Sequence, residues 1–329
     1  MTVKQKIENL LEEFKELSVN EIVNKIPVSN QMAHLALKQL IESGNVIKLG
    51  SSPKTIYRKT ALLKIEDIAE KTENTSEEEI IFLQENFLLV TDIGNLVEGI
   101  EAFKYWCTQR KLPLEKTIKE FIITKKKYEV YYNKAHIIDG TEKLKNTKEY
   151  DAIWLDKLYY LDFYAIERFG KTRLGTLLHY AKQGQNKYLM QIMMKEIEVK
   201  IKEFIKNNNI DAVAFVPPTI RRETQIMKFI QQKLNLSLPH IEIQKISGII
   251  PIPQKSLSKM NERIKNAENT FAVVDKRNFK HALLIDDAVG SGSTMNQIAE
   301  KIKNKNVAEI VTGLAVVGSF KGFDVITDV

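Results

Sequence analysis

One segment of the chain, an apolar strand that runs into a small-residue loop, constrains the fold most. Ala282–Ile285 has the apolar character of a buried parallel strand, and Asp286 and Asp287 follow it directly. The loop Gly290–Thr294 comes next, and apolar residues then recur at helical spacing as far as Ile302. This order of strand, carboxylates, glycine-rich loop and helix predicts an anion-binding turn at the carboxyl edge of a parallel sheet.

The chemistry of this turn predicts its ligand. Backbone N–H groups at a helix start hold a phosphate, and glycines let the backbone approach it closely. Two carboxylates can accept hydrogen bonds from vicinal sugar hydroxyls. A sugar with a 5-phosphate, free 2- and 3-hydroxyls and a metal-bound pyrophosphate would fit. The alternative is that the loop binds the phosphate of some other nucleotide. However, the loop lacks the two common nucleotide-binding patterns, the Gly-Lys-Ser/Thr ending of a P-loop and Gly-x-Gly-x-x-Gly.

The segment resembles the phosphoribosyl-pyrophosphate (PRPP) motif of type I phosphoribosyltransferases. The resemblance implies that Asp286 and Asp287 are catalytic residues that hold ribose hydroxyls, directly or through water bound to Mg²⁺. It also implies a 5-phosphate loop formed by Ala288, Val289, Gly290, Ser291, Gly292, Ser293 and Thr294. The implied chemistry is displacement of pyrophosphate from the anomeric carbon of PRPP by a nitrogen nucleophile.

Strands and helices alternate from about residue 155 to the end of the sequence. Met190–Ile205 and Ile226–Leu234 have apolar residues at helical spacing, and Ala212–Val216 and Ile310–Val317 are apolar strands. This alternation predicts an α/β domain over 155–329, with a doubly wound parallel sheet and ligands at the carboxyl ends of its strands.

The loop after the strand Ala212–Val216 complements the acid pair. Parallel strands end at one edge of a sheet, so the N–H groups and arginines of this loop would face the same ligand and bind pyrophosphate. The residues of this predicted pyrophosphate loop are Pro217, Pro218, Thr219, Arg221 and Arg222.

The polar segment Pro251–Ala267 is a predicted lid. In type I phosphoribosyltransferases such a segment closes over the ligand, excludes water and brings cations to the departing pyrophosphate. Its candidate cations are Lys255, Lys259 and Arg263, and Arg263 is also a candidate catalytic residue. The alternative for this segment is a solvated helical connector.

The predicted loop and lid are similar to runs of the ComF family within the type I phosphoribosyltransferases. That family has Val-Pro and then Arg-Gly-Phe-Asn-Gln, where this chain has Val216-Pro217 and then Arg221-Arg-Glu-Thr-Gln225. The next run of the family is matched, with one extra residue, by Gln254, Leu257, Ser258, Arg263, Asn266 and Phe271. Tyr164 and His179–Gly184 loosely resemble its Tyr and Lys-Tyr-x-Gly segments, whereas its cysteine-rich zinc ribbon is absent.

Residues 1–60 form a separate predicted domain. Three helical segments, with Ser18 and Ser29 as predicted N-caps of the second and third, precede a hairpin that turns at 50–54. The predicted elements are Val3–Phe14, Val19–Lys25, Asn30–Ser43, Asn45–Leu49 and Thr55–Lys59. This order resembles a winged helix-turn-helix domain and implies duplex DNA as a partner. The candidate DNA contacts are Asn30, Gln31, His34, Lys38, Lys48, Lys54 and Arg58. The alternative is a winged helix used for protein contact or dimerisation.

The chain between these domains is predicted to hold a linker helix over 61–79 and a small mixed α+β segment over 80–154. Phe87–Val90 is a predicted strand, and Val97–Gln109 is a predicted helix. Phe121–Thr124 and Tyr128–Tyr132 are predicted to form a half-buried hairpin with a basic turn. The competing interpretation is a surface on which tyrosines stack bases.

Composition narrows the classes of partner and compartment. The net charge of +7 and the pI near 9.1 favour anionic partners. The single cysteine, Cys107, excludes an intrachain disulfide and a cysteine-based zinc site. No apolar run approaches the ~18 residues of a membrane span, and the N-terminus has no apolar signal region, so a cytoplasmic protein without a membrane partner is expected. We also expect a homodimer.

Three functions are consistent with these patterns. The first is a ComF-like phosphoribosyltransferase that requires Mg²⁺. The second is a DNA-binding regulator that senses PRPP or a nucleotide, similar in layout to the purine repressors of Gram-positive bacteria. The third is an accessory protein in DNA uptake or processing. The sequence does not identify the acceptor or the role of residues 80–154.

Overall fold

The computed structural model describes residues 1–49, 55–59, 75–146, 150, 152–218, 220, 222–246 and 271–319. The chain divides into two compact units. The first comprises Met1–Lys71 and the turn Thr91–Asn95, and the second comprises Thr72–Val90 and Leu96–Val329. Within the described ranges, no helix is both long enough and apolar enough to cross a membrane.

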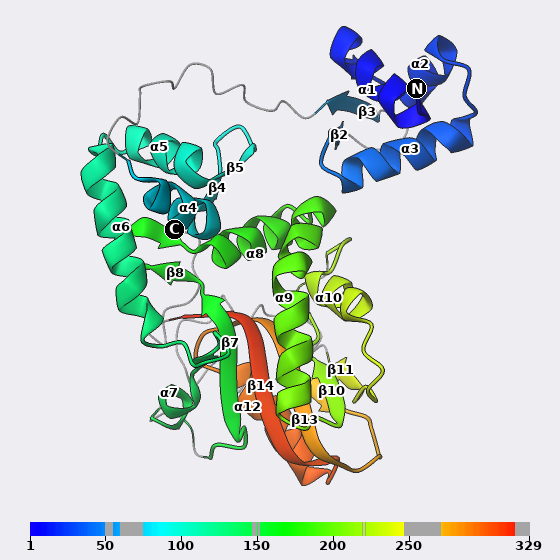
Figure 1. Ribbon diagram of the computed structural model, residues 1–329. Coiled ribbons are helices and arrows are strands. Elements are labelled where there is room, and N and C mark those ends of the chain that lie inside the picture. Colours follow the sequence, from blue (N-terminus) through cyan, green and yellow to red (C-terminus); the bar gives the residue numbers. More distant parts are fainter. Residues whose placement is uncertain are drawn as a thin grey trace. The chain divides into compact units, whose positions relative to one another are not determined.

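The N-terminal unit combines three helices with a small antiparallel sheet in strand order β1-β3-β2 (Figure 1). Its elements are α1 (Val3–Phe14), β1 (Glu16–Leu17), α2 (Val19–Lys25), α3 (Asn30–Glu42), β2 (Val46–Leu49) and β3 (Ile56–Lys59). Ser18 and Ser29 cap α2 and α3 through their side chains, as predicted. Apolar residues of the helices and of β2 and β3 form a core that includes Ile7, Leu37 and Tyr57. Strand β1 was not predicted.

The second unit is built on a five-stranded sheet in the order β10-β13-β14-β7-β6. The strands are β10 (Ala212–Phe215), β13 (Phe279–Val289), β14 (Ala308–Gly318), β7 (Lys157–Phe163) and β6 (Ile138–Asp139). Neighbours among the first four are parallel, and β6 is antiparallel to β7. The structure confirms the predicted α/β class with a parallel sheet.

Helices cover both faces of this sheet (Figure 1). On one face lie α8 (Arg173–Gln183), α9 (Lys187–Asn207) and α10 (Ile226–Leu234), which pack on alternate strand residues such as Leu283 and Ile285. On the other face, α12 (Ser293–Asn304) packs on Ala282 and Leu284. This alternation of side chains along β13 is the period-two pattern of a strand buried on both sides.

Residues 75–90 and 96–146 belong to the same unit as the sheet. Their elements are α4 (Glu77–Asn86), β4 (Leu88–Val90), β5 (Leu96–Glu98), α5 (Gly99–Gln109), α6 (Leu114–Glu129), β6 and α7 (Thr141–Lys145). Phe87, Phe103 and Phe121 form an aromatic cluster with ring centroids 4.8 to 5.4 Å apart. This cluster is part of the core that also contains Leu284 of β13.

The predicted hairpin over Phe121–Thr124 and Tyr128–Tyr132 is wrong. Residues 114–129 form the single helix α6, which buries Ile118, Phe121 and Tyr128. These positions follow the three- and four-residue spacing of a helix, and the basic residues fall in its last turn, where cations interact favourably with the helix dipole.

The remaining described elements are short. Two separate antiparallel pairs join β8 (Ala165–Ile166) to β9 (Gly170–Lys171), and β11 (Ile243–Lys245) to β12 (Phe271–Val273).

Candidate functional site

The acid pair lies inside strand β13 rather than after it. The predicted strand ends at Ile285, but the ladder with β14 continues through Asp286↔Ala315 and Val289↔Gly318. Because neighbouring residues of a strand face opposite sides, the two carboxylates flank the carboxyl end of β13 from two faces of the sheet.

Asp287 is paired with a lysine from the helix that covers its face. Lys182 Nζ, in the last turn of α8, lies 2.6 Å from Asp287 Oδ2. The Asp287 side chain is 9% exposed and the Lys182 side chain 27%. This ion pair therefore sits at the boundary between the protein interior and solvent.

Asp286 is held in an environment that disfavours its charge. Burial raises the pKa of the Asp286 carboxyl well above its ordinary value, and the nearby carboxylate of Asp287 raises it further. The ammonium of Lys182 and the Asp287 N–H, which donates to Asp286 Oδ1 at 2.7 Å, act in the opposite direction. An arriving cation or several hydrogen-bond donors would stabilise the ionised form.

The predicted phosphate loop connects β13 directly to α12. Gly292 has φ +85° and is the N-cap of the helix, and its left-handed backbone turns the chain from the strand into the first helical turn. Ser293 N–H donates to Ser291 Oγ at 3.4 Å, and Tyr150 OH donates to the Ser291 carbonyl at 3.0 Å. These contacts define the backbone path of the loop.

The N-terminus of α12 is open to an anion. No side chain caps it, and its first turn contains no acidic residue. Within the described part of the chain, the backbone N–H groups of Gly290, Ser291, Gly292 and Thr294 have no protein acceptor. Helices normally leave such groups to side chains, water or a ligand, so this loop can receive a phosphate.

A buried asparagine ties α12 to the start of β7. Asn296 is 1% exposed; its Oδ1 accepts hydrogen bonds from Trp154 N–H and Leu155 N–H at 2.8 and 3.1 Å, and its Nδ2 donates to the Ala152 carbonyl at 3.0 Å. These bonds use both acceptor positions of the amide oxygen and one of the two N–H groups, and they fix the helix beside the sheet.

The loop after β10 begins beside the acid pair. Val216 N–H donates to the Ile285 carbonyl at 2.9 Å, and Pro217 and Pro218 follow. Further along, Arg222 Nη2 donates to Gln183 Oε1 at 3.1 Å. The end of α8 thus contacts Asp287 through Lys182 and the predicted pyrophosphate loop through Gln183.

Several predicted site residues lie outside the described residues. They are Thr219 and Arg221 of the pyrophosphate loop, Lys255, Lys259 and Arg263 of the lid, and Lys54 of the predicted hairpin.

The predicted DNA contacts that the structure describes lie on three different elements of the N-terminal unit, α3, β2 and β3. Asn30, Gln31, His34 and Lys38 are exposed on α3, and Lys48 is exposed on β2. Arg58 of β3 donates to Glu16 of β1, so its guanidinium already has a carboxylate partner.

The donor set can hold Mg²⁺ only together with a ligand. The described residues contain no group of three or more His, Cys, Asp or Glu side chains that could hold a metal ion. Magnesium is typically bound through one or two carboxylates plus substrate phosphates, and Asp286 and Asp287 fit this type of site.

Sequence reasoning missed Lys182 and Gln183 as site residues. The signal was present in the apolar positions Leu174, Leu178 and Ala181, which turn one side of α8 toward the sheet and leave the next residue, Lys182, at its edge. The sequence does not show that this edge lies over Asp287, because 105 residues separate the two positions (287 minus 182).

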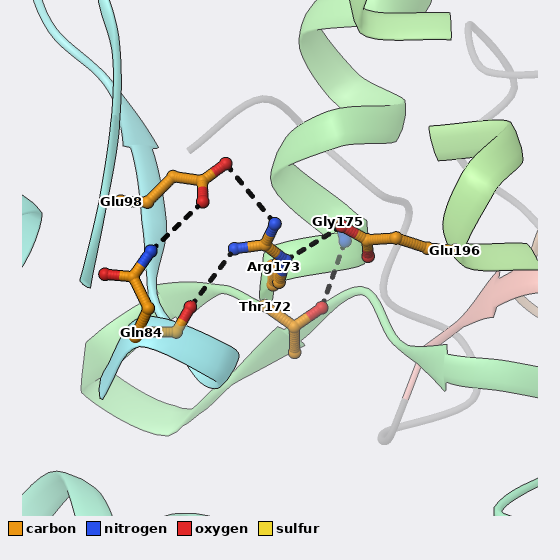
Figure 2. Close-up of polar contacts among 6 residues, drawn as sticks. All are labelled: Gln84, Glu98, Thr172, Arg173, Gly175 and Glu196. Carbon is orange, nitrogen blue, oxygen red and sulfur yellow. Dashed lines mark hydrogen bonds and ion pairs between the residues drawn. The ribbon is translucent and has the colours of Figure 1, made fainter. Parts of the chain in front are cut away.

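An ion-pair network anchors the other end of α8 (Figure 2). Arg173 Nε lies 2.8 Å from Glu196 Oε1, and Arg173 Nη2 lies 3.3 Å from Glu98 Oε1. Thr172 caps the helix by accepting from Gly175 N–H at 3.0 Å. A Cβ at Gly175 would lie 2.0 Å from the Tyr164 carbonyl oxygen, so the start of α8 is fixed against the segment that follows β7.

Comparison with known proteins shows a partial sequence similarity. No family model matches the chain. Over 86 residues, which are 26% of this chain, the sequence is 36% identical to an adenine phosphoribosyltransferase of Prochlorococcus marinus (strain MIT 9215). The match spans about half of that protein, 46% of its length. The similarity is to a phosphoribosyltransferase, as the acid-pair motif predicts; the closer resemblance to the ComF family stays a prediction.

Solved phosphoribosyltransferases resemble the structure only distantly. The alignment with a crystal structure of an adenine phosphoribosyltransferase covers 42% of this chain and 74% of that chain, at 12% identity and a TM-score of 0.29. The alignment with the Trypanosoma cruzi hypoxanthine phosphoribosyl transferase covers 42% of this chain and 69% of that chain, at 10% identity and a TM-score of 0.27. The alignment with the purine phosphoribosyltransferase from Pyrococcus horikoshii Ot3 covers 41% of this chain and 93% of that chain, at 14% identity and a TM-score of 0.24. TM-scores of this size do not establish a shared fold.

Proposed function

We propose that the second unit is a type I phosphoribosyltransferase-like domain that binds PRPP with Mg²⁺ and transfers its phosphoribosyl group to a nitrogen acceptor. The observation that carries this proposal is the open N-terminus of α12 directly after the acid pair of β13. Two carboxylates at 286–287 and a phosphate site at 290–294, with two residues between them, match a phosphorylated sugar better than a free phosphate. The similarity to an adenine phosphoribosyltransferase supports the same class of reaction.

In this proposal, different residues of the site bind different parts of the ligand. The N–H groups of Gly290, Ser291, Gly292 and Thr294 hold the 5-phosphate, and the helix dipole of α12 favours its charge. Asp286 and Asp287 accept hydrogen bonds from the ribose hydroxyls, and Arg222 lies in the loop assigned to pyrophosphate. Mg²⁺, when bound, would neutralise charge on the departing pyrophosphate. The lid residues Lys255, Lys259 and Arg263 stay part of the proposal.

The binding site is tested by replacing both carboxylates. PRPP binding with Mg²⁺ is measured by calorimetry for the wild type, for Asp286→Asn combined with Asp287→Asn, and for Glu309→Gln as a control. Glu309 is exposed near the amino end of β14, so its substitution should leave the affinity unchanged. We expect at least a hundredfold loss in the double variant, since hydrogen bonds to charged groups contribute about 1.5–3 kcal/mol each. Equal affinities would refute the site.

The acceptor is tested by chemistry rather than by binding. Pyrophosphate release is followed while the protein is supplied with PRPP, Mg²⁺ and each nucleobase or other nitrogen nucleophile in turn. Release that depends on one acceptor and is abolished in the double variant would establish a transferase. Tight PRPP binding without release for any acceptor would favour a sensor.

A DNA-binding sensor is the second candidate function, and the first unit motivates it. In this proposal, its three helices and its sheet of order β1-β3-β2 act as a winged helix, and Asn30, His34 and Lys38, which are exposed on α3, contact DNA. Duplex binding is measured with and without PRPP over a range of salt concentrations, using Lys38→Ala as the variant. Binding that weakens steeply with salt and changes with PRPP supports the sensor; binding that is insensitive to salt eliminates it.

A further inference from the structure

Lys182, which pairs with Asp287, is not among the residues assigned above to the phosphate or to the pyrophosphate. Lys182 reaches Asp287 from α8, a helix that contributes nothing to the loop over residues 288–294. Its Nζ lies 2.6 Å from Asp287 Oδ2, so the two opposite charges form a close ion pair. The carboxylate of Asp287 therefore already has a cation bound to it.

This ammonium lies where a divalent cation would otherwise bind. A metal ion approaching Asp287 alone meets a positive charge on the same carboxylate, and the low exposure of that side chain weakens solvent screening. Asp287 can bind metal only if the ammonium moves. A lysine can move in this way because its charge is carried at the end of a flexible four-carbon stem.

The surroundings of Lys182 also provide a destination for the displaced ammonium. The next residue, Gln183, accepts a hydrogen bond from Arg222 of the loop after β10, at 3.1 Å. Thr224 N–H of the same loop donates to Gln185 Oε1 at 2.8 Å. The helix turn that carries Lys182 is therefore attached to the loop assigned to pyrophosphate, while the Lys182 ammonium is paired with Asp287.

We propose that Lys182 is the resident counter-ion of Asp287, which keeps free divalent cations out of the site and moves to the diphosphate of the ligand when a ligand–metal complex binds. The site then selects a metal-complexed diphosphate over the metal ion alone. This inference rests on the proposed function, because it assigns a positioning and specificity role to one residue of that site.

The test uses two ligands for which opposite effects are expected. Mn²⁺ alone is titrated into the full-length protein and followed by electron paramagnetic resonance, and PRPP with Mg²⁺ is titrated by calorimetry. In Lys182→Met, Mn²⁺ should bind about fivefold more tightly, because a competing charge has been removed. PRPP with Mg²⁺ should bind at least about tenfold more weakly, because a charge-assisted contact has been lost. A merely structural role for Lys182 would weaken both.

Three further variants make the result specific. Lys182→Gln is measured in parallel, so that the comparison does not depend on the folding of one variant, and should behave like Lys182→Met. Lys182→Arg retains the charge and should keep the weak Mn²⁺ binding of the wild type. Lys195→Met removes an exposed charge from α9 and should change neither affinity.

Unchanged or weaker Mn²⁺ binding in both neutral variants overturns the inference, as does unchanged affinity for PRPP with Mg²⁺. A wild-type protein that does not bind PRPP would instead refute the proposed function. The Mn²⁺ comparison would still decide whether Lys182 excludes free metal ions.

Discussion

Gly292 is the residue whose backbone the phosphate loop needs most. Its φ of +85° is unfavourable for any residue with a Cβ, and an added Cβ would lie 2.9 Å from Leu144 Cδ1. We expect Gly292→Ala to lower the free energy of unfolding by about 1–2 kcal/mol and to abolish PRPP binding. Gly170→Ala is the matched control, because Gly170 has φ +75° and open space around it. Urea denaturation should show similar losses for both variants, and calorimetry should show lost binding only for Gly292→Ala.

The thiol of Cys107 is buried, and burial lowers its reactivity by raising its pKa. Burial raises the pKa of its thiol to about 11, and the hydrogen bond with Thr117 opposes this only in part. The folded protein should therefore react with a thiol reagent at pH 8 at least a hundredfold more slowly than the urea-unfolded protein, as followed by absorbance. Because the pKa is higher in the folded state than its ordinary value of 9.0, the thiol's contribution to stability is complete below pH 9 and declines as the pH rises toward 11. Fast labelling of the folded protein would contradict this prediction.

At the scale of elements, α8 contacts the acid pair at one end and an ion-pair network at the other. Lys182 at one end contacts Asp287, and Arg173 at the other end joins Glu98 and Glu196 (Figure 2). Burial raises the pKa of the Glu196 carboxyl, and the guanidinium of Arg173 opposes that effect. The charge of Glu196 therefore depends on Arg173 being present.

Removal of Arg173 should destabilise the second unit in a pH-dependent manner. We expect Arg173→Met to cost about 2 kcal/mol at pH 7, because it leaves a partly buried carboxylate without its cation. With Arg173 absent, the pKa of Glu196 rises further above its ordinary value of 4.5. The protonated carboxyl is neutral, so the cost should shrink as the pH falls toward 4.5. Lys202→Met, which breaks an exposed ion pair with Glu198 on α9, should cost less than about 0.5 kcal/mol. Urea denaturation at several pH values measures both variants, and a cost independent of pH would contradict the prediction.

At the scale of the whole molecule, the apolar cores of the two units are separate. Leu37 belongs to the core of the N-terminal unit, and Phe103 belongs to the core that contains the sheet. We expect calorimetry to show two unfolding transitions. Leu37→Ala should lower one of them and Phe103→Ala the other, at costs of about 2–5 and 3–5 kcal/mol for the unit affected. PRPP binding should survive Leu37→Ala. A shift of the same transition by both variants would show that the cores unfold together.

Local patterns in the sequence determined several of the helices and three of the parallel strands, β10, β13 and β14. The predicted bounds of α1 and α2 are those of the structure, because a side-chain cap and apolar spacing define each helix within its own residues. The order of strand, acid pair, loop and helix over 282–302 was likewise readable, since each part follows the previous one along the chain.

Only the tertiary structure decided the features that depend on distant residues. Strand β1 exists because Glu16 and Leu17 pair with Arg58 and Tyr57, which neither segment reveals alone. The hairpin predicted within 121–132 is a helix, since Ile118, Phe121 and Tyr128 bury one common side in the core beside the sheet. The pairing of Lys182 with Asp287 is also non-local, because it arises from the packing of α8 over the face of β13. Periodicity and caps act over a few residues, whereas partners across a core are set by how whole elements pack.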